Sequence, residues 1–244
     1  MANKITGSAG RFGNHFIRAH AASFIAEKRG LLFNYGPYYA NMKKLGISLY
    51  TNGTTEYKET ELIRDQDLMK NIYAATPTPK NIDMNHAYFQ TREFSNYLYQ
   101  YYRDPLRQQP IIDANLFGER YHNNSDVFVH VRLDDAAKFN QGYAYYDKAL
   151  SSIDYEYGYI SSDTIHHPIC RQLMMKYRLT PIQYGEVDTI MFGSTCKYIV
   201  LTGGTYSFMI GLLGFFSNVY YLQQFGTWHP AELFDISDWS VVRL

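Results

Sequence analysis

Residues 127–133 read VFVHVRL, and this stretch decides the fold. Nearly every position is β-branched or apolar, which is typical of a strand that is buried on both faces. Strands and helices alternate after it. Helical spacing is expected at 143–153, 165–177, 186–196 and 207–216, and extended segments at 155–161, 197–201 and 218–222. This alternation predicts an α/β fold with a parallel sheet and crossover helices.

The first half of the chain begins in the same way. A short strand at 4–6, a glycine-bearing loop, a helix at 14–28 and a strand at 31–34 are expected there. The pattern then weakens: 76–80 is expected to be a loop, 85–103 a tyrosine-rich helical region, and 104–110 a connection. Residues 122–126 (HNNSD) are a strong turn signal just before the central strand. We therefore expect two domains, 1–120 and 121–244.

Composition narrows the classes of partner. The 244 residues carry 23 Lys and Arg against 23 Asp and Glu, so the chain lacks the positive charge of a nucleic-acid-binding protein. The most apolar run, 206–221, is shorter than the roughly 20 residues that span a bilayer, and the first residues form no apolar leader. Two cysteines at no metal-ligand spacing predict inert thiols in a reducing compartment, the cytoplasm.

Three segments fall where open α/β sheets bind ligands, at strand ends and helix starts. The first, 10–15 (GRFGNH), has two glycines that let backbone approach a phosphate; it could also be a plain strand-to-helix turn. The second, 130–135 (HVRLDD), places an arginine fork at a strand end. Its alternative is a structural clamp in which Arg132 pairs with Asp134 or Asp135.

The third segment, 201–207 (LTGGTYS), carries hydroxyl groups into a helix. They suit phosphate oxygens, or Thr205 or Ser207 could simply cap the helix. Upstream, Asp188 could accept the paired N–H groups of guanine, or could be a first-turn acid favoured by the helix dipole.

Together, the order and spacing of these segments resemble the fucosyltransferase superfamily, closest to the α-1,2-fucosyltransferases of glycosyltransferase family 11 and related to the peptide O-fucosyltransferases. Residues 10–15 resemble its glycine motif, with His15 where glutamine is usual, and 130–135 are similar to its H-x-R motif. Residues 160–163 (ISSD) match its Ser-Asp strand end, and 188–207 resemble its final motif. A tyrosine pair at 145 and 146 followed by Ala149 also falls where family 11 often has one.

The resemblance implies the GT-B arrangement, two Rossmann-like domains that face a central cleft. It implies metal-independent, inverting transfer of L-fucose from GDP-fucose to a hydroxyl of a glycan, with no other cofactor. Arg132 would act on the diphosphate, and Arg11 and Asn14 would reach in from the first domain. The remaining donor-binding residues would be Gly10, Gly13, His15, His130, Asp135, Asp163, Asp188, Thr205, Tyr206 and Ser207.

Four points stay open. Asp134 and Asp135 could instead hold a metal. The general base could be His15, His20 or an acid of the first half, or the reaction could need none. The donor could be another nucleotide sugar, such as GDP- or UDP-rhamnose. From a different class, the chain could be a silent carbohydrate- or nucleotide-binding module.

Overall fold

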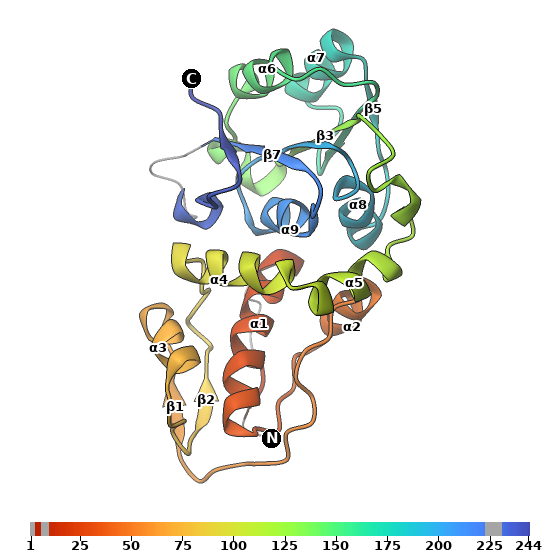
Figure 1. The fold of residues 1–244 in the computed structure, drawn as a ribbon. Helices are drawn as coiled ribbons and strands as arrows, with labels where there is room; N and C mark the ends of the chain where they lie inside the picture. The colour runs from red at the N-terminus through yellow and green to blue at the C-terminus, as the bar shows by residue number, and fades with distance from the viewer. Residues whose placement is uncertain (1–2, 6–9, 223–230) are drawn as a thin grey trace.

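A six-stranded parallel sheet forms the C-terminal half of the computed structural model, which describes residues 3–5, 10–222 and 231–244 (Figure 1). Its strands are β3 (Val127–Val131), β4 (Gly158–Ser162), β5 (Leu179–Pro181), β6 (Tyr198–Val200), β7 (Asn218–Tyr221) and β8 (Ser240–Val241). They lie in the order β5-β4-β3-β6-β7-β8, with every pair parallel. This is the strand order of a doubly wound Rossmann sheet, and the winding direction reverses between β3 and β6.

Helices cover both faces of this sheet. The connecting helices are α6 (Tyr143–Ser151), α7 (Pro168–Tyr177), α8 (Glu186–Gly193) and α9 (Thr205–Leu213). Figure 1 shows α6 and α7 on one face and α8 and α9 on the other. Strand β3 serves both layers because its side chains alternate: Val129 belongs to the core under α6 and α7, whereas Phe128 belongs to the core that includes α8 and α9. The predicted α/β class is confirmed.

The predicted elements of the second half are confirmed, with ends that differ by a few residues. Strands β5 and β8 were not predicted. They have three and two residues and lie at the two edges of the sheet, so they are too short to show a period of two.

The N-terminal half contains α1 (Phe12–Arg29), α2 (Tyr39–Lys44), α3 (Leu68–Tyr73) and a two-stranded parallel sheet of β1 (Thr60–Leu62) and β2 (Asn81–Asp83). The predicted helix at 14–28 is confirmed as α1. The strands expected at 4–6 and 31–34 are reduced, within the described residues, to the bridges Lys4 to Asn34 and Leu31 to Thr55; Thr6 lies outside those residues. The structure does not describe a second Rossmann sheet here, and the two-domain GT-B arrangement stays a prediction.

Two helices lie between the halves, α4 (Arg92–Arg103) and α5 (Pro105–Ala114) (Figure 1). The connection predicted at 104–110 is wrong, because this stretch is the first part of α5. The Asp104 side chain accepts a hydrogen bond from the Leu106 amide, and Pro105 occupies the first turn. Proline favours that position because its missing N–H would have no partner there.

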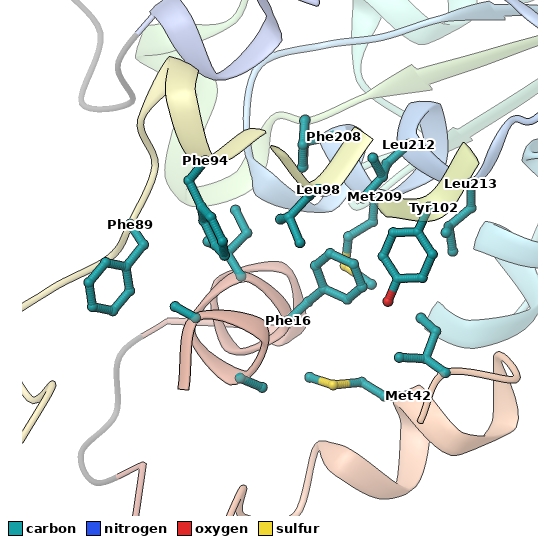
Figure 2. Close-up of a cluster of buried hydrophobic side chains, with 14 of the residues drawn as sticks. Phe16, Met42, Phe89, Phe94, Leu98, Tyr102, Phe208, Met209, Leu212 and Leu213 are labelled. Carbon is teal, nitrogen blue, oxygen red and sulfur yellow. The ribbon is translucent and has the colours of Figure 1, made fainter. Parts of the chain in front are cut away.

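The two halves share one hydrophobic core. Helix α1 packs directly on α9 and carries buried side chains all around its circumference. In Figure 2, Phe16 of α1 lies among Leu98 and Tyr102 of α4 and Met209 of α9. The same cluster extends from Phe12 to Trp239. The predicted domains 1–120 and 121–244 therefore share a core. The boundary between them stays a prediction.

The cysteines are free, and both are buried, which agrees with the prediction of inert thiols. Burial raises the pKa of the Cys196 thiol to about 12, so it stays protonated. Among the described residues, no helix is both long and apolar enough to cross a membrane.

Candidate functional site

A cavity of about 820 Å³ lies between the halves, at the carboxyl ends of the central strands. It lies where the winding of the sheet reverses, between the segments that follow β3 and β6, which is the usual ligand site of such sheets. Most of the predicted site residues line it: Gly10, Arg11, Gly13, Asn14, His130, Arg132, Asp135, Asp163, Thr205 and Tyr206. The three predicted segments thus meet in one place.

The starts of α1 and α9 meet at this cavity. A Cβ atom on Gly13 would lie 2.5 Å from the backbone nitrogen of Tyr206 and 2.6 Å from the carbonyl carbon of Thr205, so only glycine permits this approach. In the described structure, no backbone N–H of either helix start donates to an N-cap side chain, because the N-caps are Arg11, which makes no such contact, and Gly204, which has no side chain. Two helix starts without side-chain caps bring backbone N–H groups and two positive dipole ends to one cavity, a combination that favours an anion.

The hydroxyl groups at the start of α9 bind side chains of neighbouring elements instead of capping the helix. The Thr205 hydroxyl donates to Oδ1 of Asn14 at 2.8 Å, and Nε2 of Gln90 donates to the same oxygen at 3.1 Å. Ser207 is hydrogen-bonded to Nδ1 of His130 at 2.6 Å. The interpretation that Thr205 or Ser207 caps α9 is therefore wrong. These side chains connect α9 to α1 and to β3.

His130 is almost fully buried beside this contact. Burial, together with the neighbouring charge of Arg132, lowers the pKa of its imidazole to about 3, so the ring is neutral at pH 7. Its ring lies 5.2 Å from the ring of Tyr206. The His130 ring therefore contributes a neutral surface to the cavity wall and can hydrogen-bond to a ligand, but it adds no positive charge.

Both arginines of the cavity are held by carboxylates. Arg132 is hydrogen-bonded to both carboxylate oxygens of Asp135 at 2.9 and 3.3 Å, and Arg11 binds Asp134 at 2.9 Å. Arg132 lowers the pKa of the Asp135 carboxyl. The predicted clamp between Arg132 and Asp135 is thus present. The pairs are solvent-exposed on the acid side, and an exposed pair contributes only about 0–1 kcal/mol, so a diphosphate with several charges could displace the carboxylates.

Carboxylate oxygens of Asp134, Asp135 and Asp163 lie within 4.8 Å of one another and are exposed. Each already has a partner, because Asp163 accepts a hydrogen bond from the Leu133 amide at 2.8 Å and the other two face arginines. A divalent cation would compete with both guanidinium groups for these oxygens, and the metal alternative stays open.

Three predicted residues do not line the cavity. Ser207 is buried behind His130. His15 packs against Tyr38 with its ring tilted and the ring centroids 4.5 Å apart, and burial lowers the pKa of its imidazole. Asp188 lies in the first turn of α8, where Glu186 and Thr189 line the wall instead.

Several lining residues were not predicted. From the N-terminal half these are Asp65, Tyr88, Gln90 and Thr91, and from the C-terminal half Tyr184, Glu186 and Thr189. The first group lies in the short segments that follow β1 and β2. These residues were not predicted because the two strands are too short to show a periodic pattern.

Comparisons with known proteins found no family model, no curated protein and no solved structure that matches this chain.

Proposed function

We propose that this chain is a metal-independent, inverting glycosyltransferase that moves L-fucose from GDP-fucose to a hydroxyl of a glycan. One observation carries the proposal: the starts of α1 and α9 meet beside Arg132 in a large cavity between the halves. The resemblance of residues 10–15, 130–135 and 188–207 to fucosyltransferase motifs supplies the reaction class. In the proposal the two halves form the GT-B arrangement, with the donor on the C-terminal side.

The phosphates of the donor would occupy the space between the helix starts. The leaving group of the reaction is GDP, whose β-phosphate gains negative charge as the bond to the sugar breaks. Backbone N–H groups of α9, with Arg132 and Arg11, would meet that charge. Because these donors are fixed before the reaction, they lower the barrier without a metal.

Guanine would lie toward the start of α8. A carboxylate there can accept the N1 and N2 hydrogens of guanine as a pair, which uracil cannot supply. The sequence pointed to Asp188, and the cavity wall contains Glu186 from the same helical turn. We therefore assign the guanine site to this turn and test the two acids separately.

A silent nucleotide-binding module is the second candidate. The observation that favours it is that carboxylates already hold both arginines of the cavity. A binding module would need no free charge to stabilise a leaving group. It would bind GDP and release no GDP from GDP-fucose.

Calorimetry with GDP and UDP in the presence of EDTA tests the proposal. We expect GDP to bind at least tenfold more tightly than UDP, and GDP-fucose to be consumed in the same buffer. The variants Glu186→Gln and Asp188→Asn should identify the acid that makes the difference, because only its loss should bring the two affinities together. Tighter binding of UDP would refute GDP-fucose as donor. Binding of GDP without any turnover of GDP-fucose would support the silent module.

A further inference from the structure

Asp65 lies in the wall that the N-terminal half contributes to the cavity. It opens the short 3-10 helix Asp65–Asp67, directly after β1. Its Oδ1 atom accepts hydrogen bonds from the backbone amides of Tyr88 and Phe89, at 2.9 and 2.5 Å. Its second oxygen, Oδ2, accepts no hydrogen bond from any residue that the structure describes. One oxygen thus fixes the carboxylate in place and leaves the other available to the cavity.

The segment that holds Asp65 has a strained backbone. Phe89 adopts φ of 56°, a left-handed conformation that is rare for a bulky residue, and its side chain is fully buried. Strain of this kind occurs mainly where the surrounding structure serves a site. Here the turn places Tyr88 and Gln90, on either side of Phe89, in the cavity wall.

This wall connects Asp65 to the expected phosphate site. Gln90 directly follows Phe89, and its side chain donates to Asn14 on α1. Asn14 in turn accepts from Thr205, the first residue of α9. A short chain of contacts therefore links the Asp65 carboxylate to the two helix starts, and it places Asp65 on the side of the cavity opposite the sheet.

Asp65 differs from the other cavity carboxylates in its place. Four carboxylates line the cavity within the described residues: Asp65, Asp135, Asp163 and Glu186. Asp135 pairs with Arg132, Asp163 accepts from the Leu133 amide, and Glu186 accepts from Nδ2 of Asn41 at 2.7 Å. These three belong to the C-terminal half, where the proposal places the donor, whereas Asp65 belongs to the N-terminal half.

The histidines that sequence considerations left open are less suitable. His20 is fully buried and hydrogen-bonded to the Phe16 carbonyl and to Tyr102, and His15 does not line the cavity. Among the described residues, Asp65 is thus the cavity carboxylate that the N-terminal half supplies.

We propose that Asp65 is the general base that accepts the proton of the acceptor hydroxyl, an inference that rests on the function proposed above. As Oδ2 takes the proton, the hydroxyl oxygen forms a bond to C1 of fucose. The bond between C1 and the β-phosphate oxygen breaks, and its electron pair leaves with GDP. Asp65 then releases the proton to solvent. The attack comes from the side opposite the leaving group, in agreement with inversion.

The variant Asp65→Asn separates this role from a structural one. Asparagine keeps Oδ1, and with it both amide contacts, but it does not accept a proton at neutral pH. We expect kcat for fucose transfer from GDP-fucose to fall by about 10² to 10⁴-fold, the usual contribution of a general base. The KM for GDP-fucose, the Kd for GDP and the melting temperature should stay unchanged.

Asp67→Asn is the matched control, because Asp67 lies in the same 3-10 helix, outside the cavity wall, and loses the same charge. It should keep the wild-type kcat. Asp65→Ala, which also removes the amide contacts, should lower both kcat and the melting temperature. A panel of mono- and disaccharides serves as probe acceptors, and release of GDP from GDP-fucose by water is measured in parallel.

Three results would overturn the assignment. Asp65→Asn could transfer fucose at the wild-type rate while Asp65→Ala fails, which would make Asp65 a structural contact only. Asp67→Asn could lose as much activity as Asp65→Asn, which would point to a general effect of charge. If the wild-type chain neither transfers fucose nor releases GDP, the proposed function itself fails first, and the role of Asp65 with it.

Discussion

Replacing Gly13 by alanine tests the closest contact in the site. Alanine favours a helix over glycine by about 1 kcal/mol in a helix interior, so helix propensity alone predicts a slightly more stable protein. The structure predicts the opposite, because the added Cβ would lie 2.5 to 2.6 Å from backbone atoms of Thr205 and Tyr206. Backbone at a helix start cannot turn aside as a flexible side chain can. Helices α1 and α9 must therefore move apart.

Overpacking of this kind costs about 1–3 kcal/mol, and a clash with backbone belongs at the upper end of that range. After the gain of about 1 kcal/mol in helix propensity is subtracted, we expect a net loss of about 2 kcal/mol in the free energy of unfolding. For a chain of this size, that loss corresponds to a fall of about 4–8 °C in melting temperature. Separation of the helix starts should also weaken GDP binding. Thermal unfolding and calorimetry with GDP measure the two effects on the same samples.

Gly185→Ala is the control, because a Cβ at Gly185 would meet no atom within 4 Å. It should lower the melting temperature by no more than about 2–4 °C, because alanine is a poorer N-cap than glycine by up to about 1 kcal/mol but meets no clash at this position. A Gly13→Ala protein that is as stable as wild type and binds GDP equally well would refute the close approach of α1 and α9.

Three further predictions concern other parts of the site and the core. Arg132→Lys should lose most transferase activity, since a point charge cannot replace a bidentate fork; an active Lys variant would remove Arg132 from its central role. Asn14→Ala should lower sugar transfer far more than GDP binding, as paired kinetics and calorimetry would show, and unchanged turnover would leave Asn14 a structural link to Thr205. Burial lowers the pKa of His20 from 6.5 to about 4. Between these pH values His20 is protonated in the unfolded chain but neutral in the folded one, so the free energy of unfolding decreases as the pH falls below 6.5. The free energy of unfolding should decrease by about 2 kcal/mol from this group between pH 7 and pH 5, and urea titrations in which His20→Gln shows the same pH dependence as wild type would contradict this.

The sequence predicted the C-terminal sheet well because its strands are buried and its helices are regular. The run 127–133 is predicted clearly as a buried strand. The helical spacing that follows it indicates a crossover helix to the next parallel strand. The same regularity explains why the residues after β3 and before α9 were found to share one cavity. In a doubly wound sheet, topology alone brings these strand ends together.

The N-terminal wall could not be predicted in the same way. Strands β1 and β2 have three residues each, too few for any period to appear. The turn at Phe89 depends on amide contacts to Asp65, which is 24 residues away in the sequence. Contacts of this range are set by tertiary packing, so the sequence around Asp65 and Tyr88 carries no local sign of them.

The sequence also did not show which acid of α8 lines the cavity. Asp188 and Glu186 are two residues apart and therefore point in different directions around the helix. Val187 and Ile190 are buried and turn Glu186 and Thr189 toward the cavity. Residue type predicted an acid on this turn, and packing decided which acid reaches the wall.

The most direct test of the account is a crystal structure of the protein with GDP. We expect the β-phosphate within hydrogen-bond distance of Arg132 and of the first backbone amides of α9, with the start of α1 on its other side. Guanine should lie against the first turn of α8. A diphosphate bound at another place, or GDP in this cavity with its phosphates turned away from Arg132 and both helix starts, would contradict the central claim.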